Sequence, residues 1–287
     1  MRIQHAFVAG AGLMGHGIAQ VLATAGRSVD LYEPELARAD AGRGRILGNL
    51  ERGVAKGKLD ATAALEIGDR IAATDRIDAA AEADLVVEAV FEEEDVKRTL
   101  WAALDALAPG RAIFASNTSS ISIDRLAEVL APSRRPAFCG MHFFSPVPVM
   151  PLVELIRGSA TDEATVAAVR ALAGELGKQV IVSADRPGFI VNRILMPLLA
   201  EAIRALEEGI GTAEDIDTGA RVGLNHPMGP LALADFIGLD VVLGVLQVLQ
   251  EDLGDPRFAP PQTLRDLVTA GKLGQKTGEG FFRYPRG

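Results

Sequence analysis

One histidine and one carboxylate stand out in an otherwise uncharged stretch of this 287-residue sequence. Between Arg135 and Arg157 the only formal charge belongs to Glu154, and the only imidazole belongs to His142. The surrounding side chains are mostly apolar or proline, so an unpaired carboxylate would be costly there. A carboxylate on one imidazole nitrogen fixes the tautomer, so that the other nitrogen can accept a proton from an alcohol. The pair predicts a general base for oxidising a secondary alcohol, and a buried structural ion pair remains the alternative.

The other histidines are weaker candidates for a base. His5 falls within a predicted strand, His16 lies in the helix after a glycine-rich turn, and His226 lies in a proline-bounded turn. Cys139 precedes His142 by three residues, but the two would point to opposite faces of one strand. We therefore expect Cys139 to pack in the core, and His142 is the base by elimination.

A second candidate site is the run Gly10-Ala11-Gly12-Leu13-Met14-Gly15, which follows a strand pattern and opens a helical one. In this G-x-G-x-x-G spacing, Gly10 permits a tight turn, Gly12 lets the backbone approach a pyrophosphate, and Gly15 allows close helix packing. The next strand pattern ends at Glu33, where a carboxylate binds the adenosine ribose hydroxyls and repels a 2′-phosphate. The sequence predicts a site that prefers NAD over NADP, the alternative being a plain strand–turn–helix with a surface glutamate.

Polar residues near element ends supply further candidates. The run 116–120, Ser-Asn-Thr-Ser-Ser, follows a strand pattern at the carboxyl edge where open α/β sheets bind ligands, although a helix cap is also compatible. Asn192 opens a predicted helix among apolar side chains, where a core hydrogen bond is the alternative to ligand binding. Residues 43–58, in and just after the second predicted helix, contain five cations and only one glutamate. This excess of positive charge suits either an anionic ligand or a solvated helix face. These cations are Arg43, Arg45, Arg52, Lys56 and Lys58.

Strand and helix patterns alternate through the first 180 or so residues, which predicts a mostly parallel sheet with helices on both faces. The predicted strands are 3–9, 28–32, 84–89, 111–116, 136–144, 152–156 and 179–183. The predicted helices between them are 14–25, 35–56, 93–107 and 161–176. After Asp185-Arg186-Pro187-Gly188 only helices are predicted, at 190–208, 212–222, 230–236, 239–252 and 262–270. We predict a Rossmann-type α/β domain over residues 1–184 and an all-α domain over residues 185–287.

Composition narrows the partners and the compartment. Apolar residues make up 48% of the chain, enough for a packed core, and the formal net charge of −9 disfavours nucleic acid or anionic membrane as a partner. A single cysteine excludes an internal disulfide and suits a reducing cytoplasm. We find no signal-peptide pattern and no apolar run of about 18 residues that could cross a bilayer. The chain is expected to be soluble and cytoplasmic.

Several longer stretches carry a family resemblance. They are VAGAGLMGHGIA, LVVEAVFEEEDVK, FASNTSSISI, MHFFSPVPVMPLVEL, DRPGFIVNRILMPLLAEA, NHPMGPLALADFIGLD and GKLGQKTGEGFFRY. With these motifs the chain resembles the 3-hydroxyacyl-CoA dehydrogenase family, especially its stand-alone 3-hydroxybutyryl-CoA members. The resemblance covers essentially the whole sequence.

The resemblance implies NAD-dependent oxidation of a short (S)-3-hydroxyacyl-CoA to the 3-oxoacyl-CoA. It implies His142 as the catalytic base oriented by Glu154, with the family's active-site Ser and Asn at Ser119 and Asn192, which would also bind substrate. It implies that Lys56 meets the CoA phosphate and that the chain dimerises through its helical domain. Residues expected beside the cofactor are Gly10, Gly12, Leu13, Met14, Gly15, Glu33, Glu92, Lys97, Ser119 and Ser145. No metal is implied.

Two positions depart from the family pattern. Ser145 stands where many members have Asn, and its hydroxyl keeps the ability to hydrogen-bond. Glu33 stands where Asp is common, which keeps the acceptor on a longer side chain. The alternatives are a dehydrogenase of a free 3-hydroxy acid, of the carnitine or gulonate type, and a non-enzymatic NAD-binding protein.

Overall fold

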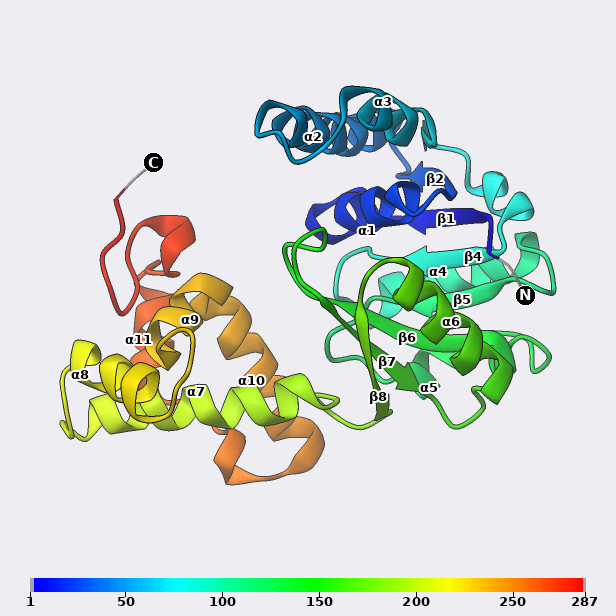
Figure 1. Cartoon of the computed structure of the whole chain (residues 1–287). Coiled ribbons are helices and arrows are strands. Elements are labelled where there is room, and N and C mark those ends of the chain that lie inside the picture. Colours follow the sequence, from blue (N-terminus) through cyan, green and yellow to red (C-terminus); the bar gives the residue numbers. More distant parts are fainter. Residues whose placement is uncertain (1–2, 286–287) are drawn as a thin grey trace. The chain divides into compact units, whose positions relative to one another are not determined.

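The computed structural model describes residues 3–285. The chain divides into two compact units, residues 1–186 and 187–287, which we call the sheet unit and the helical unit. The sheet unit alternates strands and helices, and the helical unit contains no strand among its described residues (Figure 1). The predicted fold class, a Rossmann-type mostly parallel sheet followed by an all-α region, is confirmed.

The described part of the sheet unit forms one eight-stranded sheet in the order β3-β2-β1-β4-β5-β6-β7-β8. Neighbouring strands are parallel except for β6 and β7, which are antiparallel. The order reverses at β1, so the carboxyl ends of β1 and β4 flank the switch point at which such sheets bind ligands. The strands are β1 (His5–Ala9), β2 (Ser28–Tyr32), β3 (Ile71–Thr74), β4 (Leu85–Glu88), β5 (Ile113–Ser116), β6 (Phe138–Phe143), β7 (Leu152–Arg157) and β8 (Gln179–Ala184).

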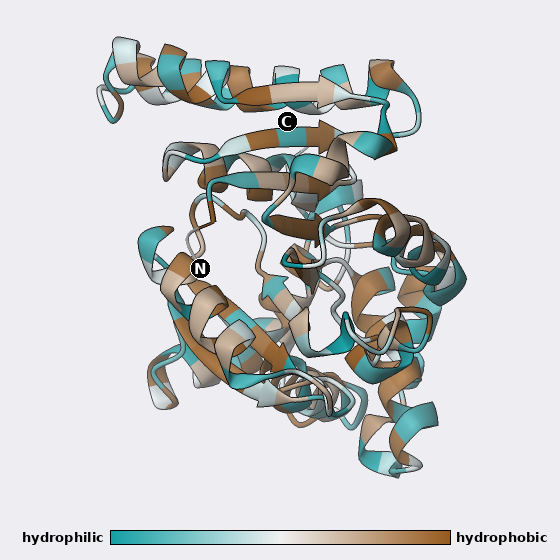
Figure 2. Ribbon diagram, turned by 90° about the vertical axis from the view of Figure 1, so that its right-hand side faces the viewer, coloured by the Kyte–Doolittle hydropathy of each residue, from teal (hydrophilic) through white to brown (hydrophobic). Residues whose placement is uncertain are grey.

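Helices cover the sheet and complete its core. Every residue of β4, β5 and β6 is buried, as expected for strands that are packed on both faces. In Figure 2 the helix ribbons change between apolar and polar colours along their length, the pattern of amphipathic helices. The helices are α1 (Leu13–Thr24), α2 (Leu36–Ala55), α3 (Ala61–Asp69), α4 (Glu94–Leu107), α5 (Ile123–Ala127) and α6 (Glu163–Glu175).

Three strands or α-helices of this unit were not predicted from the sequence: β3, α3 and α5. β3 has only four residues, Ile-Ala-Ala-Thr, and its alanines carry little strand preference. It is a strand because it pairs with β2 over its whole length. α5 has five residues and begins at Ile123, after Ser122, whose side chain caps the helix. The helix-cap alternative for the 116–120 run placed a helix start nearby.

The helical unit has its own apolar core, which includes Met196, Leu199, Leu231, Leu246 and Phe258. Its helices are α7 (Val191–Glu207), α8 (Ala213–Thr218), α9 (Pro230–Ile237), α10 (Leu239–Leu253) and α11 (Gln262–Thr269). The predicted helix 212–222 is α8 followed by a π-helical turn, Gly219–Gly223.

Two buried aspartates organise this core around α9. Asp217 accepts hydrogen bonds from the backbone N–H groups of Leu231 and Ala232 in the first turn of α9. Asp235 accepts from two backbone N–H groups and from the Tyr284 hydroxyl, and thereby fastens the C-terminal segment. Burial raises the pKa of Asp235 above its usual value.

Within the described residues, no single helix is long and apolar enough to cross a membrane; α9 and α10 meet the length and composition test only as a pair bent by 97°.

A half-buried ion pair between β1 and β2 gives the sheet unit a pH-dependent contribution to stability. His5 Nε2 lies 2.8 Å from Asp30 Oδ2, and the hydrogen bond to Asp30 raises the pKa of His5 above its usual value. A raised folded-state pKa stabilises the fold fully below about pH 6.5, and this contribution disappears as pH rises through the folded-state pKa. We expect His5→Gln to lower the free energy of unfolding by about 0.5–1 kcal/mol near pH 6 and by less near pH 9. Urea unfolding of both proteins at the two pH values checks this, and a difference that grows with pH would contradict it.

Candidate active site

His142 and Glu154 meet because β6 and β7 run antiparallel. Their Cα atoms are direct partners in the register, so both side chains leave the sheet on the same face. His142 Nδ1 lies 3.1 Å from Glu154 Oε2, the His142 residue is 5% exposed, and Glu154 is fully buried. With an ionised Glu154, Nδ1 carries the proton and Nε2 is the nitrogen that can accept one.

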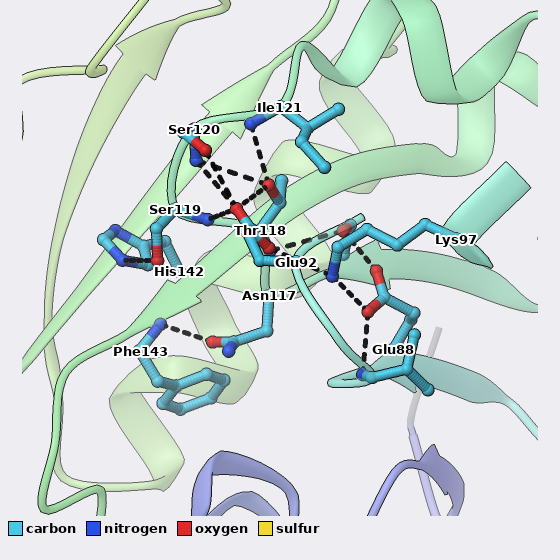
Figure 3. Close-up of polar contacts among 12 residues, drawn as sticks. Glu88, Glu92, Lys97, Asn117, Thr118, Ser119, Ser120, Ile121, His142 and Phe143 are labelled. Atoms are coloured by element: carbon cyan, nitrogen blue, oxygen red, sulfur yellow. Dashed lines mark hydrogen bonds and ion pairs between the residues drawn. The ribbon is translucent and has the colours of Figure 1, made fainter. Parts of the chain in front are cut away.

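Ser119 lies at the other nitrogen of the same imidazole. Its Oγ is 3.1 Å from His142 Nε2, and the Phe144 ring lies against the imidazole with the centroids 4.5 Å apart. Ser119 comes from the turn that follows β5, at the carboxyl edge of the sheet (Figure 3). The structure therefore brings Ser119, His142 and Glu154 into one hydrogen-bonded series.

Asn117 aligns the turn that carries Ser119 with the strand that carries His142. Its Oδ1 accepts a hydrogen bond of 2.9 Å from the backbone N–H of Phe143, the residue after His142 (Figure 3). The backbone N–H of Asn117 donates to the carbonyl of Glu88, which extends the pairing of β4 and β5 by one residue. Because Asn117 and Phe143 are both buried, the hydrogen bond between them fixes the end of β5 relative to the end of β6.

Glu92 and Lys97 lie behind the same turn. Glu92 Oε1 accepts from the backbone N–H of Ser119 at 2.7 Å and of Ser120 at 3.0 Å, and from the Thr118 hydroxyl at 2.6 Å. Burial alone would raise the pKa of Glu92, but the Lys97 ammonium and the hydrogen bonds from the turn hold that pKa below its usual value. Lys97, which was expected beside the cofactor, is only 1% exposed.

The glycine-rich turn has the backbone that a dinucleotide site needs. Gly10 has a φ of +100°, and a Cβ there would lie 2.5 Å from the Ala89 carbonyl oxygen. A Cβ on Gly15 would lie 1.7 Å from the Gly10 carbonyl oxygen, so only glycine fits. A Cβ on Gly12, by contrast, would meet no protein atom within 4 Å. Packing does not demand glycine at position 12, and the open backbone at this helix start suits an approaching phosphate.

Glu33 completes this turn. It follows β2, and its Oε1 accepts a hydrogen bond of 2.7 Å from the backbone N–H of Ala11. Leu13 is 71% exposed at the start of α1, whereas Met14 packs against the core. The carboxylate thus lies against the phosphate turn, where it can also accept from ribose hydroxyls. These residues fit a bound NAD.

A cavity of about 730 Å³ in the sheet unit contains Lys56 and Ser145 in its wall. Lys56 directly follows α2, and Arg52 and Lys58 line the same cavity. The other two cations of the predicted basic segment, Arg43 and Arg45, do not line the cavity and instead donate to backbone carbonyls. The run therefore divides into cations that hold backbone and cations that face the cavity.

Lys178 was missed by the sequence analysis. It is 8% exposed, and its Nζ donates to the carbonyls of Val147 at 2.6 Å and Met150 at 2.7 Å. It thereby anchors the loop between β6 and β7, which carries Ser145 into the cavity wall. The sequence shows only that Lys178 is a basic residue shortly after a predicted helix, which does not indicate its role.

Comparisons with known proteins decide the family. Residues 5–186 match the model "3-hydroxyacyl-CoA dehydrogenase, NAD binding domain", and residues 188–284 match "3-hydroxyacyl-CoA dehydrogenase, C-terminal domain". The chain belongs to the 3-hydroxyacyl-CoA dehydrogenase family. Two relatives are a 3-hydroxybutyryl-CoA dehydrogenase of Bradyrhizobium diazoefficiens, 50% identical over 96% of this chain and 94% of that protein, and a probable one of Bacillus subtilis, 45% identical over 99% and 98%.

Solved structures of family members have the same fold. FadB2 of M. tuberculosis superimposes with a TM-score of 0.96 at 43% identity, covering 99% of this chain and 100% of that chain. The (S)-3-hydroxybutyryl-CoA dehydrogenase PaaH1 of Ralstonia eutropha gives 0.95 at 44% identity, with the same coverage. The resemblance stated from the motifs is confirmed, and with it the NAD-binding character of the sheet unit.

Asn192, Cys139 and His226 are the remaining candidate residues of this 3-hydroxyacyl-CoA dehydrogenase family member. Asn192 is buried in the first turn of α7, in the helical unit. Cys139 is fully buried in β6, and burial raises the pKa of its thiol to about 12, so it packs in the core as expected. His226 lies in the helical unit between α8 and α9. No cluster of three or more metal-ligating side chains occurs among residues 3–285.

Proposed function

We propose that this chain oxidises the 3-hydroxyl of a short (S)-3-hydroxyacyl-CoA to the 3-oxoacyl-CoA, with NAD as the acceptor. The observation that supports this best is the series Ser119 Oγ–His142 Nε2 and His142 Nδ1–Glu154 Oε2 in a chain of this family. The names of the relatives indicate the substrate class.

In the proposed mechanism the chain moves one proton. His142 Nε2 accepts the proton of the 3-hydroxyl, and the Glu154 carboxylate stabilises the resulting imidazolium through Nδ1. The Ser119 hydroxyl, already within hydrogen-bond distance of Nε2, donates to the same substrate oxygen and polarises the developing carbonyl. Asn192, from the helical unit, contributes an amide contact to the substrate. Bound NAD supplies the hydride acceptor at C4 of its nicotinamide.

The cofactor preference follows from Glu33. Its carboxylate lies on the phosphate turn and would repel the 2′-phosphate of NADP. We expect Glu33→Ser to raise the ratio of kcat/KM for NADP to that for NAD by about tenfold or more, since one removed repulsion is worth roughly 1–3 kcal/mol. Steady-state kinetics with both cofactors measures this ratio. The neighbouring Glu35→Ser is the matched control, and an unchanged ratio in Glu33→Ser would remove Glu33 from cofactor selection.

The CoA part of the substrate is assigned to the cavity lined by Arg52, Lys56 and Lys58. CoA carries a 3′-phosphate that dephospho-CoA lacks. A lysine that pairs with this phosphate therefore strengthens the binding of CoA esters only. We expect Lys56→Ala to raise KM for 3-hydroxybutyryl-CoA by about tenfold with kcat retained, and to leave KM for the dephospho-CoA ester unchanged. Equal effects on both esters would show that Lys56 does not bind this phosphate. Arg43→Ala serves as a control because Arg43 donates to backbone carbonyls.

We further propose that the helical unit binds substrate and forms a homodimer. Large apolar side chains on it are strongly exposed, among them Ile210 at 73%, Val222 at 80% and Leu224 at 65%, which suits an interface with a second copy. We also propose a cytoplasmic location, since a chain with a single cysteine forms no internal disulfide and suits a reducing compartment.

One substrate comparison tests the proposed function. NADH formation is followed with (S)-3-hydroxybutyryl-CoA, free 3-hydroxybutyrate and carnitine under identical conditions. We expect kcat/KM for the CoA ester to exceed that for the free acids by at least about 10³-fold, because the CoA contacts are absent from the free acids. A higher kcat/KM for either free acid would indicate a free-acid dehydrogenase, and absence of NADH with any substrate would indicate a binding protein.

A further inference from the structure

The loop that joins β6 to β7, residues 144–151, is short of backbone hydrogen-bond donors. Three of its eight residues are prolines, at positions 146, 148 and 151, and a proline has no N–H. The N–H groups of Val149 and Met150 both donate to the Pro146 carbonyl, at 2.9 and 3.0 Å. Among the described residues, no backbone N–H donates to the carbonyls of Val147 and Met150. We call this segment the proline loop.

Lys178 supplies the donors that the proline loop lacks. It directly precedes β8, and its Nζ donates to the Val147 carbonyl at 2.6 Å and to the Met150 carbonyl at 2.7 Å. The next residue, Gln179, donates its backbone N–H to the Pro151 carbonyl at 2.6 Å. A buried carbonyl without a donor is costly, so the ammonium stabilises this conformation of the loop.

Helix α1 packs closely against the same loop. Val147 is 3% exposed and belongs to the core of the sheet unit. A Cβ on Gly17 of α1 would lie 2.9 Å from Val147 Cβ and 3.5 Å from Pro148 Cδ, so the helix backbone touches the loop there. Val149, by contrast, is 74% exposed, and residues 145–149 together line the cavity of about 730 Å³. The loop is therefore a wall of this cavity, held by α1 and by Lys178.

Lys178 differs from the other buried cations in how its charge is balanced. Among residues 3–285, four lysine or arginine side chains are buried: Arg27, Lys97, Arg134 and Lys178. The first three each form an ion pair with a carboxylate, whereas the two acceptors of Lys178 are carbonyls. A buried charge without a counterion is costly, and burial accordingly lowers the pKa of Lys178 below its usual value. The fold thus keeps a positive charge that no carboxylate of the described residues neutralises.

The cavity that Lys178 lines is rich in positive charge. Arg52 and Lys56 line it too, and Glu175, the only carboxylate among the described residues in its wall, pairs with Arg27. CoA, the ligand proposed for this cavity, carries a diphosphate in addition to the 3′-phosphate. The charge of Lys178 favours an anion in the cavity, and its hydrogen bonds hold one wall of the cavity in place. Both effects concern binding, and neither reaches the hydroxyl that is oxidised.

We propose that Lys178 is a positioning residue for binding of the CoA ester. It replaces the backbone donors that the prolines remove, and it thereby holds the proline loop as a wall of the cavity. The identity of the ligand rests on the proposed function, whereas the anchoring of the loop stands independently. The role differs from that of Lys56, because it does not depend on the 3′-phosphate.

Amide hydrogen exchange tests the anchoring without any ligand. Exchange at the Val149 and Met150 amides is measured in wild type, in Lys178→Met, which has a side chain of similar length without donors, and in Arg134→Met. Arg134 is the matched control because it is also a buried cation that donates to backbone carbonyls, those of residues 108, 109 and 112. We expect exchange at both amides to become about tenfold faster or more in Lys178→Met and to stay unchanged in Arg134→Met.

Kinetics with two esters tests the consequence for binding. Lys178→Met is expected to raise KM for 3-hydroxybutyryl-CoA and for its dephospho-CoA analogue by the same factor, about tenfold or more, because both esters carry the diphosphate and use the same wall. We expect kcat and the NADH dissociation constant to stay within about threefold of wild type, since His142 and the glycine-rich turn are untouched. Arg134→Met should leave KM unchanged for both esters.

Unchanged exchange at Val149 and Met150 in Lys178→Met, or equal acceleration in Arg134→Met, would overturn the anchoring. Unchanged KM for both esters, or a rise confined to the ester with the 3′-phosphate, would overturn the role in binding. If Lys178→Met does not fold, Lys178→Gln decides with a threshold of about threefold, because its amide removes the charge but keeps a donor. Wild-type protein that forms no NADH from 3-hydroxybutyryl-CoA would end the proposed function, and calorimetric affinity for CoA and dephospho-CoA would then replace KM in the comparison.

Discussion

His142→Ala is expected to lower kcat for 3-hydroxybutyryl-CoA by about 10²- to 10⁴-fold, the usual contribution of a general base. The variant removes the group that accepts the hydroxyl proton and leaves the glycine turn and Glu33 in place. The NADH dissociation constant should therefore stay close to that of wild type, and KM should change little. Stopped-flow or steady-state NADH formation together with fluorescence titration of NADH measures both quantities.

Two controls make this prediction specific. His226→Ala removes a histidine of the helical unit and should retain wild-type kcat. Added imidazole should restore part of the lost rate in His142→Ala, because the substitution leaves space where a small base can act. Turnover of His142→Ala within about threefold of wild type would exclude this residue as the base.

Glu154→Gln is expected to cost about 10²- to 10⁴-fold in kcat. Glutamine has the same shape as glutamate, but it lacks the charge that stabilises the imidazolium, and its amide can present a donor to Nδ1 and so favour the wrong tautomer. Because Glu154 is fully buried and faces Nδ1 at 3.1 Å, water cannot replace it. The same kinetic and NADH-binding measurements apply, with thermal unfolding to show that the variant is folded.

Comparing kcat with the unfolding midpoint distinguishes a role of Glu154 in orienting His142 from a role in stabilising the fold. Glu154→Gln should lower kcat while the NADH dissociation constant and the unfolding midpoint remain near those of wild type. Arg134→Met, which breaks the buried pair with Asp105, should show the opposite pattern, with a lower unfolding midpoint and unchanged kcat. A Glu154→Gln enzyme with full kcat would mean that the pair has only a structural role.

The sequence was informative where composition and spacing report burial. The scarcity of charge around His142 and Glu154 indicated a buried pair, because an unpaired carboxylate is costly in apolar surroundings. The G-x-G-x-x-G spacing indicated the tight turn between β1 and α1. Gly10 and Gly15 are required there because no side chain fits at either position. Local sequence could not supply the direction of β7. The antiparallel register that places His142 opposite Glu154 depends on the path of the intervening loop.

Buried polar residues were harder to predict. The run Glu92-Glu93-Glu94-Asp95 before Lys97 is typical of an exposed charged helix start, and only the spacing of Lys97 to Trp101 and Leu104 indicates its burial. Asn117 carries no signal beyond its place after a strand, because its partner is the backbone of β6. Lys178 likewise binds backbone carbonyls of a loop distant in sequence. Such contacts exist only in the assembled fold.

A crystal structure of the protein with NAD and acetoacetyl-CoA tests the central claim most directly. We expect the C3 oxygen of the ligand to lie about 2.6–3.2 Å from both His142 Nε2 and Ser119 Oγ, with His142 Nδ1 still hydrogen-bonded to Glu154. An imidazole turned away from that oxygen, or a C3 oxygen bound by other side chains beyond reach of His142, would contradict it.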